Sequence, residues 1–497
     1  MARVVVVGAG LGGLAAAARL AALGHAVTVL EQADTVGGKL GTYSRDGWTF
    51  DTGPSLVTLP AVYRDLFRKT GRPLERELDL VPVDPTCHYR FPDGVEVDVP
   101  NASRAGVRRA FDGALGSGTG DQWLSFLDRA ERIWRATRTP FLESPLGPGD
   151  LVRLSRRVGD LRAVAPWRSL RGLGEQYLRD PRLRMFLDRY ATYTGSDPRR
   201  APAALAVVPY VEQTFGAWYV PGGLRRLGEA VRARAEARGA VVRTGADVVE
   251  ILRPGGRAAG VRLLDGEEVP ADLVVANADA THLYRDLVPG AVGARALRRV
   301  RRATPSLSGF VLLLALRGRT PGLRHHTVLF PQDYDDEFDS VFGREARPVP
   351  DPTVYVSAPD DPALRPSEDS EAWFVLVNAP RHGVDGAPGT VDWTSPGLVD
   401  SYADRVLAVM AARGLEVRDR LVWREIRAPH DLERLTRSPG GAIYGTSSNG
   451  ARAAFLRPAN RSPVAGLYLV GGSSHPGGGL PLVGLSAAIV ADLVGRA

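Results

Sequence analysis

Apolar residues near the start of the chain form short runs that lead into glycines. Arg3–Val7 is a β-branched run, which predicts a buried parallel strand, and a glycine-rich turn from Gly8 to Gly13 follows it. The alanine-rich segment 14–23 predicts a helix that ends at Gly24, and Ala26–Leu30 predicts a second strand. Strand, glycine turn, helix and strand in this order indicate a dinucleotide-binding unit.

Three glycines of this turn have separate expected roles. Gly8 permits the tight turn, Gly10 lets the backbone approach a pyrophosphate, and Gly13 lets helix and strand pack closely. Glu31 follows the second strand, where an acidic side chain accepts hydrogen bonds from ribose hydroxyls and disfavours a 2′-phosphate. The alternative is a βαβ unit whose glycines serve packing alone.

Two further segments indicate which dinucleotide is bound. Gly37 and Gly38 precede Lys39, and two glycines followed by a cation suit further contact with a pyrophosphate. A pair of surface turns is the alternative. Near the other end, a strand-like run at 467–470 leads into a glycine-rich turn at 471–479 and a small-residue helix. One nucleotide held by both ends of a long chain suggests a flavoprotein rather than an NAD dehydrogenase.

The pattern between the two ends predicts further regular elements. A helix is expected at 224–238, and the segment 76–214 reads as mostly helical. Segments rich in proline and aspartate, 331–372 and 380–397, are interpreted as surface loops. Strands are expected at 240–244, 248–252, 259–264, 272–277, 310–316 and 373–377.

Composition narrows the function classes. A length of 497 residues suggests two or three domains, and no apolar run approaches the roughly 20 residues of a membrane-spanning helix. The net charge of +7 comes without a nucleic-acid-binding motif, so no nucleic acid partner is expected. Cys87 is the only cysteine, which excludes an intrachain disulfide and suggests a reducing cytoplasm. We expect no metal site and interpret His325-His326 as a solvated pair in a loop.

Residues 4–55 resemble the FAD-binding start of the bacterial-type carotenoid (phytoene) desaturases, which belong to a wider group with the amine oxidases and protoporphyrinogen oxidase. Segments 217–223 and 428–445 resemble later motifs of that family, and 467–488, with His475-Pro476-Gly477-Gly478-Gly479, closely resembles its C-terminal flavin motif. The matches cover nearly the whole chain in family order. Lys39 departs from the arginine of many members, and the wording of 51–55 and 472–474 leans towards branches that act on modified intermediates, such as the hydroxycarotenoid 3,4-desaturases.

The resemblance implies an α/β fold, with a discontinuous Rossmann-like FAD-binding domain of the amine oxidase and phytoene desaturase type and a mixed α+β substrate domain. The expected cofactor domain comprises 1–75, 215–290 and 431–497, and the expected substrate domain comprises 76–214 and 291–430. His475 is the best candidate for a catalytic polar group, although a role in shaping its turn is equally compatible. Further FAD contacts are implied for Gly53, Pro54, Ser55, Val248, Gly472, Leu482 and Val483.

The implied function is FAD-dependent desaturation of an acyclic carotenoid by hydride transfer to flavin N5, in carotenoid biosynthesis. The substrate would be phytoene or a later, even hydroxylated, intermediate. Such an enzyme needs a hydrophobic polyene substrate and an electron acceptor such as oxygen or a quinone. The alternatives are a carotenoid oxidase or isomerase, an amine oxidase-like flavoprotein, and a non-catalytic prenyl-lipid escort protein.

One segment suggests contact with a membrane. Apolar residues at 151, 154, 158 and 161 share one helical face, and the arginines of this segment lie largely elsewhere. A basic amphipathic helix suits an anionic membrane surface, whereas a core helix with a solvated arginine face is the alternative. Because a carotenoid must be drawn from lipid, we expect a cytoplasmic protein that is peripheral on the inner face of the cell membrane. The segment 145–190 would be the helical part that associates with it.

Overall fold

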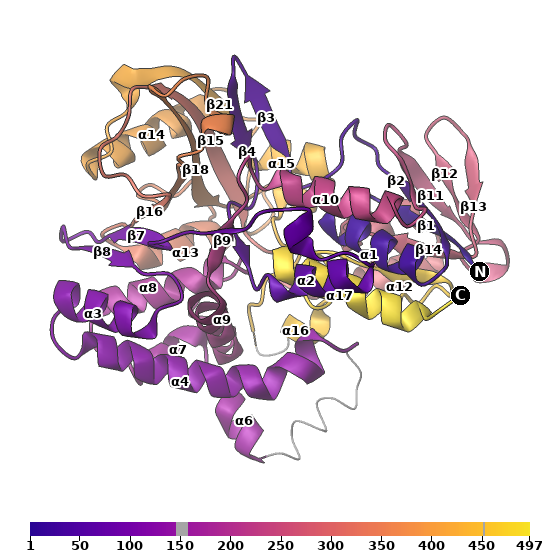
Figure 1. The fold of residues 1–497 in the computed structure, drawn as a ribbon, viewed down its shortest axis with the longest axis horizontal. Helices are drawn as coiled ribbons and strands as arrows, with labels where there is room; N and C mark the ends of the chain where they lie inside the picture. Colours follow the sequence, from indigo (N-terminus) through magenta and orange to yellow (C-terminus); the bar gives the residue numbers. More distant parts are fainter. Residues whose placement is uncertain (146–157, 451–452) are drawn as a thin grey trace.

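The structure, a computed structural model, describes residues 1–145, 158–450 and 453–497 (Figure 1). Both chain ends lie beside a five-stranded parallel sheet with the order β10-β2-β1-β14-β22. Numbered along the chain, this is the order 3-2-1-4-5 of dinucleotide-binding folds, in which the order reverses between β1 and β14. The strands are β1 (Arg3–Val7), β2 (Ala26–Leu30), β10 (Val241–Arg243), β14 (Leu273–Ala276) and β22 (Leu467–Leu469).

Helix α1 (Leu11–Ala22) packs against both α10 (Arg225–Glu236) and α17 (Leu480–Val494). Alanines 15–18 are fully buried, and their small side chains allow this close approach of helices from three distant parts of the sequence. The His25 ring lies 3.0 Å from the Gly495 carbonyl oxygen, which fastens the C-terminal end beside the N-terminal unit. The predicted α/β fold with a discontinuous Rossmann-like part is therefore confirmed.

A small antiparallel sheet connects β10 to β14 where a crossover helix would otherwise lie. Its strands are β11 (Val248–Leu252), β12 (Gly260–Leu263) and β13 (Glu268–Pro270), in that order. The strands predicted at 248–252 and 259–264 match β11 and β12, which pair antiparallel across the turn at 255–256.

A second, seven-stranded sheet has the order β21-β15-β18-β17-β16-β7-β8. Alternate residues of β18 face opposite sides: Trp373 and Val375 pack with α14 (Leu398–Ala412), whereas Phe374 and Leu376 border a cavity. The sheet combines strands from two parts of the chain: β7 and β8 precede the segment 215–290, and the other strands follow it. The strands are β7 (Cys87–Arg90), β8 (Glu96–Val99), β15 (Ser308–Arg317), β16 (His326–Leu329), β17 (Val354–Ser357), β18 (Ser370–Ala379) and β21 (Leu421–Arg427).

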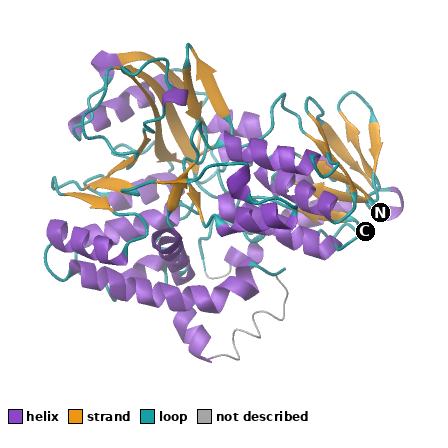
Figure 2. Cartoon of the chain, viewed as in Figure 1, coloured by secondary structure: helices purple, strands orange, loops and turns teal. Residues whose placement is uncertain are grey.

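A layer of helices lies below this sheet in Figure 2. Its core is aromatic: Trp123, fully buried, contacts Phe111, Phe126 and Phe186. The edge-on contacts with Phe111 and Phe186, which lie on other helices, fix the helices against one another. The helices are α3 (Arg104–Leu115), α4 (Thr119–Thr137), α6 (Val158–Val164), α7 (Leu170–Gly174), α8 (Pro181–Thr192) and α9 (Val207–Phe215).

The remaining elements are short or peripheral. The helices are α2 (Ala61–Lys69), α11 (Ala280–His282), α12 (Ala291–Val300), α13 (Tyr334–Phe342), α15 (Pro429–Thr436) and α16 (Ala453–Leu456), and the strands are β3 (Thr42–Arg45), β4 (Trp48–Asp51), β5 (Val57–Thr58), β6 (Val81–Pro82), β9 (Ala217–Tyr219), β19 (Arg381–His382) and β20 (Thr390–Val391). The single turns of tighter or wider helix are η1 (Leu74–Arg76), η2 (Arg138–Leu142), η3 (Ala203–Ala206), η4 (Pro254–Gly256), η5 (Leu283–Leu287), η6 (Pro362–Leu364), η7 (Arg418–Arg420) and η8 (Pro439–Gly441).

Two interpretations of the sequence are wrong. The segment 331–372 is not a surface loop, because it contains α13 and β17, and β17 lies between β16 and β18 in the second sheet. His326 is not solvated in a loop: it begins β16, is buried, and its Nδ1 lies 3.0 Å from the Thr86 carbonyl oxygen. The prolines and aspartates that flank β17 suggested a loop. This short strand is buried because β16 and β18 lie on either side of it.

The membrane prediction is only partly covered by the structure. Residues 151–157 of the predicted amphipathic segment lie outside the described residues, and α6 begins at Val158. In the part of the chain that the structure describes, no helix has the length and apolar character needed to cross a bilayer.

Candidate cofactor and substrate site

One cavity of about 1080 Å³ lies where the carboxyl ends of the parallel strands meet the second sheet and the helical layer. Small-molecule sites commonly occupy about 300–1,000 Å³, so this cavity lies at the large end of that range. Gly13 packs behind the cavity wall, whereas every other predicted site residue lines it. The lining residues are Gly8, Gly10, Glu31, Gly37, Gly38, Lys39, Gly53, Pro54, Ser55, Val248, Gly472, His475, Leu482 and Val483.

The first glycine turn has the close contacts that its spacing predicts. Gly8 has a φ of +94°, which favours glycine, and a Cβ on Gly13 would lie 2.2 Å from the Gly8 carbonyl oxygen. A Cβ on Gly10 would lie 2.7 Å from Nδ2 of Asn277, the residue after β14. Because these positions are glycines packed against Asn277, the backbone is exposed to the cavity at the point where the strand order reverses, between β1 and β14.

Two helices begin at the cavity, and among the described residues no side chain caps either N-terminus. Gly10 precedes α1, and Gly479 precedes α17; neither helix has a side-chain cap or an acidic residue in its first turn. The first N–H groups of a helix lack intrahelical partners and attract anions. Both helix starts line the cavity, so its glycine-lined half suits a ligand with phosphate or other anionic character.

Glu31 lies beside the glycine turn, as the sequence predicts. Its Oε2 accepts from the Ala9 N–H at 2.7 Å and its Oε1 from the Ala33 N–H at 3.0 Å. Each carboxylate oxygen retains acceptor capacity for a hydroxyl of a ligand in the cavity. At the same end, Arg437 forms a bidentate ion pair with Asp247, next to Val248.

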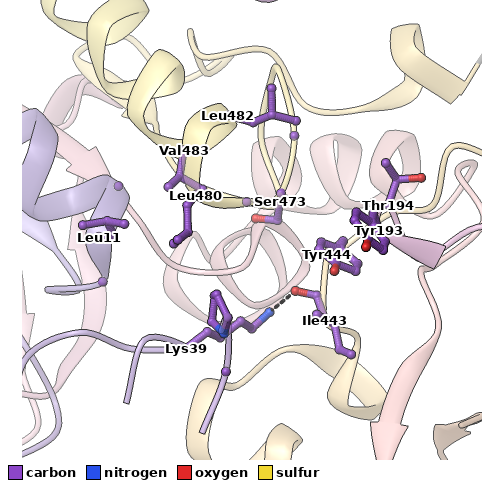
Figure 3. A pocket seen from close by; sticks show the side chains of 18 of the residues that line it. Leu11, Lys39, Tyr193, Thr194, Ile443, Tyr444, Ser473, Leu480, Leu482 and Val483 are labelled. Carbon is purple, nitrogen blue, oxygen red and sulfur yellow. Dashed lines mark hydrogen bonds between the residues drawn. The ribbon is translucent and has the colours of Figure 1, made fainter. Parts of the chain in front are cut away.

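Lys39 reaches across the cavity. Its ammonium donates to the Ile443 carbonyl oxygen at 2.6 Å (Figure 3). It also donates to the Ala442 carbonyl oxygen at 3.0 Å and to Ser438 Oγ at 3.2 Å. Burial of the ammonium lowers its pKa to about 8, against the attraction of Asp279, which raises it. Lys39 thus joins the N-terminal glycine segment to the C-terminal wall, and its predicted contact with a pyrophosphate stays a prediction.

The C-terminal motif forms the opposite wall. Figure 3 shows Leu480, Leu482 and Val483, at the start of α17, across the cavity from Lys39. Arg457, which sequence reasoning missed, donates to the carbonyl oxygens of Gly472 at 2.7 Å and Tyr444 at 3.1 Å. Its burial lowers the pKa of the guanidinium to about 10. No motif around Arg457 distinguishes it in the sequence from the many other arginines of the chain.

His475 lines the cavity and is also tied into its own turn. Its Nε2 lies 2.9 Å from the Ser144 carbonyl oxygen. Its backbone carbonyl accepts from Asn460 Nδ2 at 2.8 Å and from Ser486 Oγ at 2.8 Å. These contacts fix the turn after β22, while a catalytic role for the imidazole stays a prediction.

The far half of the cavity is walled by apolar side chains. Sheet residues Phe374 and Leu376 face helix residues across it, and the wall continues to α6. Polar side chains interrupt it, among them Arg189, Tyr193, Glu212 and Tyr355, and none of these four was predicted from the sequence. The apolar helix-side residues are Trp134, Leu142, Leu161, Val164, Leu205, Val207, Val208 and Val211.

Within the described ranges, no three side chains of histidine, cysteine, aspartate or glutamate lie together as a metal site would require. Cys87 lines the cavity, and burial raises the pKa of its thiol to about 12, which keeps it protonated. The lining therefore combines bare backbone, two helix ends and apolar surface.

Comparison with known proteins gives two kinds of match. The model of the family described as "Flavin containing amine oxidoreductase" matches residues 11–369. The crystal structure of an oxidoreductase from Methanosarcina mazei has the same fold, with a TM-score of 0.63 at 18% identity over 99% of this chain and 100% of that one.

Two curated proteins are similar over almost their full lengths. A hydroxyneurosporene desaturase from Rubrivivax gelatinosus is 36% identical over 99% of this chain and 92% of that protein. A 4,4'-diapolycopene oxygenase from Methylomonas sp is 34% identical over 99% of this chain and 98% of that protein.

Proposed function

Because this chain belongs to the bacterial-type carotenoid desaturases, within the flavin-containing amine oxidoreductases, we propose that it is an FAD-dependent desaturase of an acyclic carotenoid. The observation that supports this most is the continuity of one cavity from a glycine-lined half to an apolar half. A dinucleotide suits the first half, and a long hydrocarbon suits the second. A cofactor and a lipid would therefore meet inside the protein.

The residues of the glycine-lined half fit FAD. The open helix starts at Gly10 and Gly479 suit its pyrophosphate and ring, and Glu31 suits a ribose hydroxyl. We propose that 1–75, 215–290 and 431–497 form the domain that holds it, with the substrate domain formed by 76–214 and 291–430. The further proposed contacts are Gly8, Gly13, Gly37, Gly38, Lys39, Gly53, Pro54, Ser55, Val248, Gly472, Leu482 and Val483.

Bound FAD would supply a hydride acceptor at N5 for an allylic C–H bond, and an electron acceptor such as oxygen or a quinone would be needed to complete the cycle. The protein itself positions the substrate and excludes water from it. Apolar side chains such as Val208, Val211 and Leu376 hold the hydrocarbon by packing, since it offers no charge to bind. Positive charge left on the polyene is delocalised, so removal of the neighbouring proton does not require a strong base.

The test begins with the purified protein. Flavin absorbance that follows the protein, or that appears on adding FAD, is expected; its absence would favour a lipid escort role. The holoenzyme is then incubated with phytoene, neurosporene and their hydroxylated forms, and each added conjugated double bond shifts the pigment spectrum to the red. Unchanged spectra with all of them would contradict desaturation, and turnover of amines instead would favour an amine oxidase-like activity.

A second candidate function is oxygenation of a carotenoid. The 34% identity to a protein named as an oxygenase favours it. Incubation under ¹⁸O₂, followed by mass spectrometry of the pigment, separates the two. The product of a desaturase is lighter than the substrate by two mass units for each step, whereas the product of an oxygenase carries ¹⁸O.

We also propose that the protein is peripheral on a membrane surface. The apolar half of the cavity extends to Leu161, Val164 and Pro166, and the next residue, Trp167, is 65% exposed. Tryptophan favours the interface of a bilayer. Co-sedimentation with anionic phospholipid vesicles is expected, and Trp167→Ser should weaken it. The matched control is Val384→Ser, because Val384 is 66% exposed and does not line the cavity; equal losses would contradict this orientation.

A further inference from the structure

A buried guanidinium faces the apolar half of the cavity. Arg189 on α8 is 8% exposed and lines the cavity. Its Cζ lies 5.3 Å from the ring centroid of Tyr193 and 5.2 Å from that of Tyr355. Within residues 1–145, 158–450 and 453–497, no oxygen accepts a hydrogen bond from it, and its Nε is buried without a partner. Two aromatic faces therefore hold the cation while its N–H groups stay unused.

A buried carboxyl group lies on the next helix. Glu212 on α9 is 5% exposed and lines the same cavity. Its Oε1 accepts from the Tyr190 hydroxyl at 2.7 Å, which fixes the side chain. Among the described residues its Oε2 makes no hydrogen bond of good geometry, although the Tyr193 hydroxyl lies near enough to help lower the pKa of the carboxyl group. Burial raises the pKa of Glu212, and Arg189 is among the groups that oppose this. Over the same ranges, the two side chains form no ion pair with one another.

This arrangement is costly unless a ligand completes it. An arginine stays charged at any ordinary pH, and a buried charge without hydrogen bonds destabilises the folded protein. A plain hydrocarbon chain would bury both side chains without supplying a partner for either. A hydroxyl group can accept a hydrogen bond from a guanidinium and donate one to a carboxylate oxygen at the same time.

We propose that Arg189 and Glu212 form a binding site for a hydroxyl group at one end of the substrate. This inference rests on the proposed function and narrows its substrate class from acyclic carotenoids to those with a hydroxylated end. The hydroxyl oxygen accepts a hydrogen bond from the Arg189 guanidinium, and the hydroxyl group donates a hydrogen bond to the Glu212 carboxylate. A carboxylate end group would be repelled by Glu212, so an alcohol fits the pair better than an acid.

The position of the pair also bears on which bond reacts. Tyr355, whose ring holds Arg189, shares a hydrogen bond with Ser55, a proposed cofactor contact. The hydroxyl site therefore adjoins the cofactor half of the cavity. A substrate anchored there places a bond close to its hydroxylated end, rather than the middle of the polyene, beside the cofactor.

The test measures binding separately from turnover. The holoenzyme is titrated with an acyclic carotenoid and with its matched hydroxylated derivative in detergent, and binding is followed by the shift of the pigment spectrum. Tighter binding of the hydroxylated form, by about tenfold or more, is expected, because only this ligand satisfies both buried groups. Equal binding, or tighter binding of the hydrocarbon, would overturn the inference even if both are desaturated.

Variants then assign the preference to the two residues. Arg189→Met and Glu212→Gln should each reduce the preference to within about twofold of equality while the hydrocarbon binds as before, and Arg189→Lys should retain part of it. Arg184→Met is the matched control, since Arg184 lies on the same helix without lining the cavity. If one of the two variants does not fold, the other and the wild-type preference still decide.

The flavin potential distinguishes a substrate role from a cofactor role. The midpoint potential and flavin content of Arg189→Met should match those of the wild type. A shifted potential with an unchanged preference would overturn the inference and assign Arg189 to the flavin. Preferential binding of the hydroxylated form without any turnover would instead uphold this site and contradict the proposed desaturase activity.

Discussion

The two halves of the cavity are built from different parts of the polypeptide. Around the glycine turn, the wall is backbone: glycines, two helix starts and the carbonyl groups that receive Lys39 and Arg457. Around α8, α9 and the second sheet, the wall is formed by side chains, most of them apolar, with polar groups that include Arg189, Glu212, Tyr193, Tyr355 and His326. At several positions of the backbone wall a Cβ is unfavourable, because of a close contact or a positive φ, whereas an apolar wall tolerates many exchanges of similar volume. The first half should therefore fail sharply on small changes, and the second should fail only when its polarity changes.

The largest effect is expected at Gly13. A Cβ there would lie 2.2 Å from a backbone oxygen, so Gly13→Ala must displace the turn or α1. We expect the free energy of unfolding to fall by about 1–3 kcal/mol or more, with loss of bound flavin. Thermal unfolding and the ratio of flavin to protein absorbance measure both.

The matched control for Gly13 is Gly113→Ala in α3. A Cβ on Gly113 meets nothing within 4 Å, and alanine favours a helix, so stability should rise by up to about 1 kcal/mol. Retention of flavin and stability by Gly13→Ala would show that the backbone wall is less exacting than the comparison requires.

A change of polarity should disable the apolar half. Val208→Asp places a carboxylate in the wall that would contact a polyene. We expect kcat/KM for the polyene to fall about 100-fold, because burying a charge against hydrocarbon is unfavourable, while flavin content stays normal. Val208→Ala should cost only a few-fold, and Val422→Asp, at an exposed site on β21, should change little. Parallel loss of flavin in Val208→Asp would break the separation of the halves.

Low pH should destabilise the folded protein through His325. Burial lowers the pKa of His325 to about 4, so between pH 4 and 6.5 the unfolded chain binds a proton that the folded chain does not. Stability therefore rises with pH across this window and is lost as pH falls, by up to about 2–3 kcal/mol. Urea unfolding at pH 4.5 and 7 measures the difference. His325→Phe, which keeps the ring beside Tyr219, should reduce the dependence without abolishing it, because burial also lowers the pKa of the neighbouring His326; an unchanged slope would contradict this assignment.

The smallest effect is expected at Glu31. Glu31→Gln keeps the shape of the side chain but weakens the charge-assisted hydrogen bonds to the Ala9 and Ala33 N–H groups. The Kd for FAD should rise about tenfold, as followed by quenching of flavin fluorescence on titrating the apoprotein. Hydroxyl preference of the bound polyene should not change. A change in that preference would mean that the two halves are coupled.

How far the sequence predicts the molecule follows the same division. The turn from Gly8 to Gly13 and its flanking elements were predictable, because glycine spacing is a local constraint. β17 was not, since three apolar residues among prolines acquire strand structure only between β16 and β18. Likewise, nothing around Arg189 or Arg457 distinguishes them from the other arginines of the chain. Their roles arise from burial beside residues that are distant in sequence.

By itself, the sequence determined the βαβ unit, the carotenoid desaturase family and which short segments line the cofactor half of the cavity. Those features depend on residues near one another along the chain, where φ, the absence of Cβ and helix ends are set locally. Only the tertiary structure decided that Lys39 reaches Ile443, that the second sheet joins distant segments, and that Arg189 and Glu212 share one cavity. Burial and the absence of a partner are properties of surroundings, and those surroundings exist only once the chain has folded.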